Sequence, residues 1–263
     1  MWDFEHGKAG RDFDISYTLP SACARALQSG AADIGIIPAA AYTHIPGLEI
    51  LPEVAIASKR AVRSILLVSR VPIEKIRSVA LDTSSMTSVA LTKVIFEKWL
   101  GAGRIFSPME PDLNKMLSAH DAGLLIGDPA LQVDRTRYFT LDLAEEWIRH
   151  TGKPFVFAFW AVRQAALGAD AFPNSHDLPA IFQQSRDHGL ESANLDYISR
   201  DWAPRLGLTE QEVRSYLTQN IYYHLDSPCM DGLRLFYRYA GEIGALPEAP
   251  EIRFIETAAT VRS

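Results

Sequence analysis

Cysteine is scarce in this chain of 263 residues, and no long apolar run occurs in it. The two cysteines, Cys23 and Cys229, lie near opposite ends, which is too few for a disulfide-stapled scaffold and typical of free thiols in a reducing compartment. The longest apolar runs, 122–127 and 155–162, are far shorter than the roughly 20 residues that span a bilayer. Since the first residues also lack the basic and apolar regions of a signal peptide, we expect a cytoplasmic protein without membrane contact.

Basic residues are in the minority, with 26 Lys and Arg against 32 Asp and Glu and a net charge of −6. This balance argues against nucleic acid or an anionic membrane as a partner, because both attract a basic stripe. The motifs G-x-G-x-x-G, G-x-x-x-x-G-K-[ST], C-x-x-C and G-x-S-x-G are absent, and the seven histidines lack metal-ligand spacing. The sequence therefore predicts no nucleotide, metal or other cofactor.

Strand and helix signals alternate through the first two thirds of the chain. Apolar alternation or short apolar runs predict strands at 13–17, 33–37, 49–56, 64–69, 78–81, 105–106, 122–126 and 155–162. Helices are expected at 21–28, 88–99, 112–120 and 142–150, followed by a helical tail at 178–188, 194–206, 209–220 and 231–240. Thr209 and Glu212 have the spacing of a capping box. This order predicts an α/β fold with parallel sheets covered by helices on both faces.

The length suits two lobes, and a strand meets a proline at Pro72. The strong strand at 155–163 is the best candidate for the return of the chain to its first lobe. We therefore expect a discontinuous first lobe of residues 1–70 plus 164–263, an inserted second lobe of residues 71–163, and a cleft between them.

A run of hydroxyl side chains follows the predicted strand at 78–81. Residues 82–88 read Asp-Thr-Ser-Ser-Met-Thr-Ser and stand where a helix begins. Free N–H groups at a helix start, joined by Ser and Thr hydroxyls, form a neutral cradle for a carboxylate or phosphate. The same residues are also favoured at any helix N-terminus for capping alone. Both interpretations are open on composition.

Two strand ends and one basic cluster are further candidates. Pro38 and the Gly127–Asp128 turn each follow a short apolar strand, where open α/β sheets bind ligands, although Asp128 also suits a simple turn. The basic cluster precedes the strand at 64–69 and consists of Lys59, Arg60 and Arg63. Such a cluster is usually a solvated face, but this one is placed to draw an anion toward the cleft.

Five segments, taken together and in this order, resemble the chorismate dehydratase family of the futalosine route to menaquinone. They are G-x-x-D-I-G-I-I-P at 30–38, V-R-S-I-L-L-V-S at 62–69, L-D-T-S-S-x-T-S at 81–88, A-G-L-L-I-G-D at 122–128 and W-x-x-x-T-G-x-P-F-V-F-A at 147–158. The resemblance implies a fold like the type II periplasmic binding proteins. It also implies that an anionic small molecule, chorismate, loses water to give 3-[(1-carboxyvinyl)oxy]benzoate. In that family the substrate's own enolpyruvyl carboxylate takes the ring proton, so the protein supplies orientation and hydrogen-bond donors.

The resemblance also assigns roles. Ser64 falls on the family's active-site serine. The residues expected to bind substrate are Ser84, Ser85, Thr87, Ser88, Gly127, Asp128 and Pro38. Met86 stands where an arginine is common in relatives, so this protein either does without that positive charge or uses Lys59, Arg60 or Arg63 instead.

The start of the chain departs from the family pattern. Relatives begin with a strand that contains Leu-Asn-x-x-Pro-Leu, whose Asn is catalytic, and no such segment occurs here. Either translation begins upstream of Met1 or the first lobe lacks a strand. We expect the chain as written to have little or no dehydratase activity.

Three other interpretations stay open. A solute-binding protein has the same architecture, and an inactive, N-terminally truncated paralogue has the same segments. The later naphthoate-forming enzyme shares the fold, but its Ser-Pro-Cys-Pro-Asn-Asp opening is absent here. A homodimer is compatible with the sequence.

Overall fold

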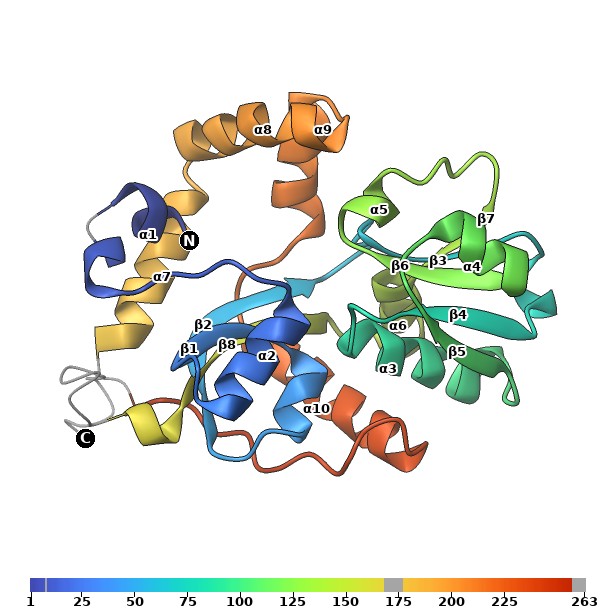
Figure 1. The fold of residues 1–263 in the computed structure, drawn as a ribbon, viewed down its shortest axis with the longest axis horizontal. Coiled ribbons are helices and arrows are strands. Elements are labelled where there is room, and N and C mark those ends of the chain that lie inside the picture. Colours follow the sequence, from blue (N-terminus) through green and yellow to red (C-terminus); the bar gives the residue numbers. More distant parts are fainter. Residues whose placement is uncertain (8, 168–176, 257–263) are drawn as a thin grey trace.

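The computed structural model describes residues 1–7, 9–167 and 177–256, which form two β-sheets with helices around them (Figure 1). The first sheet has the strand order β1-β8-β2, with β1 at Ile34–Pro38, β8 at Phe155–Arg163 and β2 at Leu48–Ser58. The second has the order β5-β4-β6-β3-β7. Its strands are β5 Ile105–Met109, β4 Ser78–Asp82, β6 Ala122–Ile126, β3 Ile65–Ser69 and β7 Phe139–Asp142.

The first sheet is antiparallel and the second is mixed, so the expectation of parallel sheets is wrong. Both β1 and β2 run antiparallel to β8, and β3 runs antiparallel to β6 and β7. Only β4 makes parallel pairs, with β5 and β6. The reason is that β8 returns to the first sheet after the whole second sheet, so no single helical crossover imposes its direction.

The described residues form ten α-helices, which include all eight that the sequence predicted. Those before β8 are α1 Trp2–His6, α2 Pro20–Ser29, α3 Thr87–Ile95, α4 Leu113–Ala119, α5 Asp128–Leu131 and α6 Leu143–Thr151. The tail contains α7 Leu178–Gly189, α8 Ser192–Leu206, α9 Glu210–Ser215 and α10 Ser227–Glu242. π-Helical turns at Phe96–Leu100 and Tyr216–Asn220 extend α3 and α9. The capping box between Thr209 and Glu212 is confirmed.

The strand predicted at 13–17 is wrong, because that segment is irregular. Its alternating apolar side chains, Phe13 and Ile15, pack in a small cluster with Phe4 and Phe182 instead of against a neighbouring strand. Helices α1 and α5 and the strand β7 were not predicted. An apolar alternation therefore marks a buried face here but not the partner that buries it.

Sheet pairing favours lobe boundaries other than the expected residues 70 and 163. β3 pairs within the second sheet and β8 within the first, so the chain crosses between residues 58 and 65 and returns between residues 151 and 155. We propose that the lobes divide at these two segments. A single hydrophobic cluster, which includes Phe159 of the first sheet, Val79 of the second and Val94 of α3, continues across the division.

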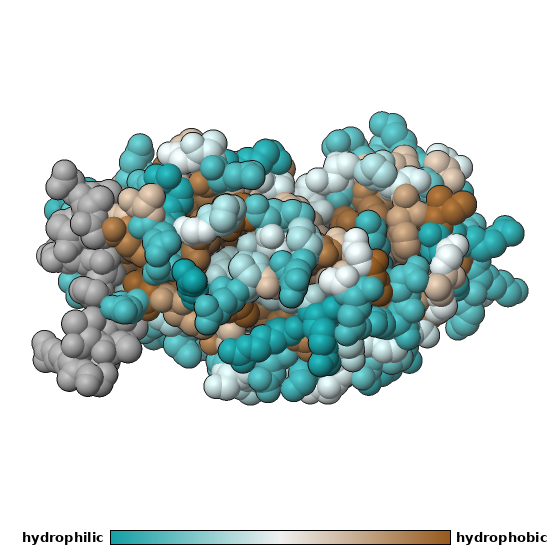
Figure 2. Space-filling view, turned by 90° about the horizontal axis from the view of Figure 1, so that it is seen from below, coloured by the Kyte–Doolittle hydropathy of each residue, from teal (hydrophilic) through white to brown (hydrophobic). Residues whose placement is uncertain are grey.

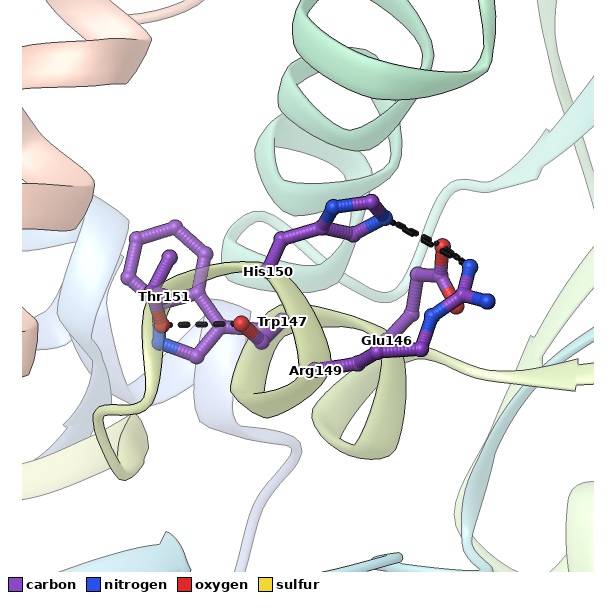
Figure 3. A network of polar contacts seen from close by, with 5 residues as sticks. All are labelled: Glu146, Trp147, Arg149, His150 and Thr151. Carbon is purple, nitrogen blue, oxygen red and sulfur yellow. Dashed lines mark hydrogen bonds and ion pairs between the residues drawn. The ribbon is translucent and has the colours of Figure 1, made fainter.

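The second crossing, between residues 151 and 155, follows α6, whose side chains make the polar contacts shown in Figure 3. Glu146 is 3% exposed and pairs with Arg149 and, at 2.9 Å, with His150. Trp147 is fully buried, and its Nε1 donates to the Pro154 carbonyl oxygen at 3.2 Å. A Cβ at Gly232 of α10 would lie 2.1 Å from that same oxygen. Only glycine lets α10 approach the second crossing so closely.

Candidate functional site

Three of the predicted site segments meet at one edge of the second sheet. Since β4 and β6 are parallel, their carboxyl ends, at Asp82 and Ile126, point the same way. β3 runs antiparallel to β6, with Ile65 opposite Ile126, so its amino end lies at this edge too. The topology therefore brings Ser64, the Gly127–Asp128 turn and the hydroxyl-rich elbow of residues 82–88 to one edge, from segments far apart in sequence.

Ser64 is held at both its main chain and its side chain. Its carbonyl oxygen accepts the Gly127 N–H at 2.8 Å. Its hydroxyl oxygen accepts the Tyr216 hydroxyl at 2.9 Å, and the side chain is 5% exposed. Burial raises the pKa of Tyr216, against the opposing effects of the Ser64 hydrogen bond and of Arg63. Tyr216 is therefore neutral, and because a phenol is a stronger hydrogen-bond donor than an aliphatic hydroxyl, we take Tyr216 as the donor and Ser64 as the acceptor of this bond.

The residue before Ser64 has an unusual backbone. Arg63 has φ of 66°, in the left-handed region that non-glycine residues rarely adopt. Asp142, the N-cap of α6, holds this turn because its carboxylate accepts the N–H groups of Val62 at 3.1 Å and Arg63 at 2.7 Å. The same carboxylate also accepts two N–H groups of the α6 first turn. Strain of this kind persists only where the surroundings impose it, and it is common beside functional groups.

The hydroxyls of the elbow are not equivalent. Ser84 donates its hydroxyl proton to Asp82 Oδ1 at 2.6 Å, and its N–H goes to the same oxygen at 2.8 Å. Ser85 Oγ accepts the Ser88 N–H at 3.2 Å, so its own proton is available to a ligand. Asp82 is 1% exposed, and its Oδ2 has no partner among the described residues. Ser85 is thus a better carboxylate donor than Ser84 in this arrangement.

Thr87 connects the two lobes. Its Oγ1 accepts the Ala40 N–H at 3.1 Å and donates to the Phe157 carbonyl oxygen at 3.1 Å, and the residue is 2% exposed. Ala40 lies in the turn after Pro38, the buried end of β1, whose partner in β8 is Ala158. Pro38 therefore lies on the first-lobe side of the hydrogen bonds that Thr87 of the elbow makes with Ala40 and Phe157.

The Gly127–Asp128 turn is exposed. Gly127 has φ 66° and ψ −141°, a conformation that is essentially restricted to glycine, and Asp128 begins the short helix α5. The Asp128 carboxylate is near enough to raise the pKa of Tyr216, after the larger effect of burial. The turn thus lies beside the Ser64–Tyr216 pair.

The basic cluster does not act as one group. Lys59 pairs with Asp226 at 2.8 Å and lies 3.6 Å from the centroid of the Tyr222 ring. Burial alone would raise the pKa of Asp226, but hydrogen bonds from Lys59 and the Cys229 N–H outweigh it and hold that pKa far below its usual range. Of the three basic residues, Arg63 is the one adjacent to Ser64.

Two residues of this site, Tyr216 and Asp142, were not singled out from the sequence. Asp142 carried a helix-start signal, but no sequence signal indicated that its carboxylate also accepts the Arg63 N–H, 79 residues away. Tyr216 carried no signal, because its partner is 152 residues away.

A separate cavity of about 730 Å³ lies between α10 and the C-terminal segment. Its lining includes Arg234, Arg238 and Glu248, and none of the predicted site residues. Helix α10 lies toward the lower side of the molecule in Figure 1. Figure 2 views the molecule from that side, and the face that it shows is mostly hydrophilic. In the described ranges, no three His, Cys, Asp or Glu side chains are grouped to hold a metal ion. Every helix described is too short or too polar to traverse a membrane.

Comparison with known proteins gives consistent results. The chain is 31% identical over 256 residues to a protein named chorismate dehydratase from Thermus thermophilus, which covers 90% of this chain and 89% of that protein. It is 28% identical over 194 residues to a chorismate dehydratase from Campylobacter jejuni, with coverage of 71% and 66%.

Two solved structures show the fold. Protein AF1704 from Archaeoglobus fulgidus superposes with a TM-score of 0.66 at 17% identity, covering 88% of this chain and 86% of that one. The periplasmic aliphatic sulphonate-binding protein SsuA from Escherichia coli gives 0.62 at 15% identity, covering 92% and 81%. The predicted two-lobed fold, like that of the periplasmic binding proteins, is confirmed. Because a family model described as menaquinone biosynthesis matches residues 1–242, which include both sheets and the helical tail, this chain belongs to the menaquinone biosynthesis family.

Proposed function

We propose that this protein is a cytoplasmic chorismate dehydratase, a hydro-lyase that forms 3-[(1-carboxyvinyl)oxy]benzoate and water on the futalosine route to menaquinone. The names of the curated relatives and the family match support this reaction. The two cysteines are free thiols, as a reducing compartment favours. Chorismate is the proposed partner, and the homodimer stays a prediction.

One structural observation carries the proposal. Ser64 lies where three segments of the second sheet converge, with its hydroxyl oxygen occupied by Tyr216 and its proton free to donate. Dehydration breaks the C–H bond beside the ether and the neighbouring C–O bond, and the hydroxyl leaves with a proton as water. Aromatisation drives this step, so the site needs positioned donors more than a strong base.

We assign the following roles. Ser64 is the catalytic serine, and its hydroxyl donates to the substrate. Ser85 and Ser88 hold a substrate carboxylate at the start of α3, where free N–H groups and the helix dipole favour an anion. The Gly127–Asp128 turn lines the other side, and Pro38 closes the first-lobe side. Ser84 and Thr87 shape this region through their own hydrogen bonds.

The test is a direct assay of the full-length protein. Incubation with chorismate, followed by chromatography and mass spectrometry, should show the benzoate product. Ser64→Ala should lower kcat about 10²-fold, the cost of removing one positioned donor. Ser118→Ala is the matched control, because Ser118 is an exposed α4 serine that bonds only within its helix.

Two results would contradict the proposal. Absence of the benzoate from the wild-type reaction excludes the dehydratase. Binding of chorismate without turnover would instead support the solute-binding interpretation, which the likeness to SsuA in fold makes the natural second candidate.

A further inference from the structure

The hydrogen bond between Tyr216 and Ser64 joins two parts of the molecule that sequence keeps apart. Tyr216 lies in the π-helical turn that extends α9. The part of the tail that carries Tyr216 is attached to the first sheet on both sides. Before it, α7 packs on β2, and after it, Tyr222 forms a β-bridge with Ala57 of β2. Ser64 ends the first crossing and leads into the second sheet. The tail therefore places the Tyr216 hydroxyl beside Ser64, across the division between the lobes.

The direction of this bond decides what Ser64 can do. A hydroxyl has one proton and two lone pairs. Tyr216 donates at 2.9 Å and so occupies one lone pair of Ser64, while no acceptor for the Ser64 proton is present among the described residues. Accepting a hydrogen bond also polarises a hydroxyl and makes it a stronger donor. The Ser64 hydroxyl thus has no acceptor for its proton among the described residues, and it is a stronger donor because it accepts a hydrogen bond itself.

We propose that Tyr216 is a positioning residue for Ser64, which orients the serine proton toward the substrate; this inference rests on the proposed function. The location supports it, since short π-helical turns inside α-helices are frequent at functional sites. The backbone on the other side of Ser64 is clamped independently, through Arg63 and Asp142. With its backbone clamped and one lone pair occupied, the Ser64 hydroxyl has fewer directions in which to donate.

The first experiment is a double-mutant cycle with chorismate turnover. Tyr216→Phe removes only the hydroxyl and should lower kcat about 10-fold with KM changed less than 2-fold, since one hydrogen bond is lost. In the Ser64→Ala background the same change should have no further effect. Tyr223→Phe is the control, because Tyr223 is a neighbouring tyrosine whose hydroxyl makes no hydrogen bond in the described residues. Equal losses from Tyr216→Phe in both backgrounds overturn the inference.

A second readout needs no turnover and separates this inference from the proposed function. Ser64→Cys introduces a thiol whose thiolate Tyr216 should stabilise, so its alkylation midpoint should rise by about one pH unit when Tyr216→Phe is added. Burial raises the pKa of Cys23 and raises that of Cys229 to about 12, and peptide mapping separates alkylation of these two native thiols from alkylation at position 64. Identical midpoints refute the positioning role. A clear shift without benzoate formation by the wild type refutes only the dehydratase.

Discussion

Thr87 gives the sharpest test of how the two lobes are held together. Its hydroxyl accepts the Ala40 N–H and donates to the Phe157 carbonyl oxygen, each at 3.1 Å, in a position that is 2% exposed. Phe157 needs this donor because the β2–β8 pairing shifts register between Ile56 and Ala57, which leaves Phe157 without an opposite residue. Thr87→Val keeps the shape and removes both hydrogen bonds.

The expected loss is large for a single exchange. Each buried backbone group left without a partner costs about 1–3 kcal/mol, so two such groups should cost about 2–6 kcal/mol. That is a substantial part of the 5–15 kcal/mol by which domains are typically stable. By contrast, a threonine that only contacts substrate would change affinity and leave the free energy of unfolding nearly unchanged.

The assay is urea denaturation of both forms, with the midpoint and the slope measured together. Thr92→Val is the matched control: Thr92 is equally buried in α3, but its hydroxyl bonds to the Ser88 carbonyl of the same helix at 2.8 Å. We expect its loss to stay below about 1 kcal/mol, since that carbonyl keeps its helical partner. If the two variants unfold at the same urea concentration, the assignment of Thr87 as the tie between lobes is wrong.

Three further predictions concern single residues. Asp142→Asn should lower the free energy of unfolding by about 1–3 kcal/mol and reduce turnover, because four N–H groups donate to this carboxylate. The control is Asp112→Asn in the same urea assay. It should cost less, because the Asp112 side chain caps α4 with one N–H bond in an exposed position. Gly127→Ala should cost about 1–3 kcal/mol in thermal melts through its backbone alone, since a Cβ there meets nothing within 4 Å, and Gly207→Ala, in the milder left-handed region, should cost less. Asp226 has a lowered folded pKa, so its stabilisation is present above its unfolded pKa of about 3.9 and is lost as pH falls further. Asp226→Asn should therefore melt below the wild type at about pH 7, and the gap should narrow as pH falls from about 4 toward about 2; a constant gap would contradict the linkage.

Local hydrogen bonds made several features predictable from sequence. Helix α2 begins with Pro20 and ends at Gly30, whose φ of 77° is the left-handed C-cap that glycine favours. The capping box of Thr209 and Glu212 spans only three residues. The five resembling segments likewise predicted the family and the two-lobed fold, because each is a contiguous run whose order along the chain can be read directly.

The tertiary structure alone decided the rest. Strand direction in the first sheet and the place of each crossing depend on which strand β8 meets after the chain has left for the second lobe. The same holds for which hydroxyls are free: Thr87 is committed to Ala40 and Phe157, while Ser64 receives its proton donor from Tyr216, 152 residues away. A composition of serines and threonines shows that hydroxyls are available. Only folding decides where their protons point, because the partners come from segments that periodicity and capping do not relate.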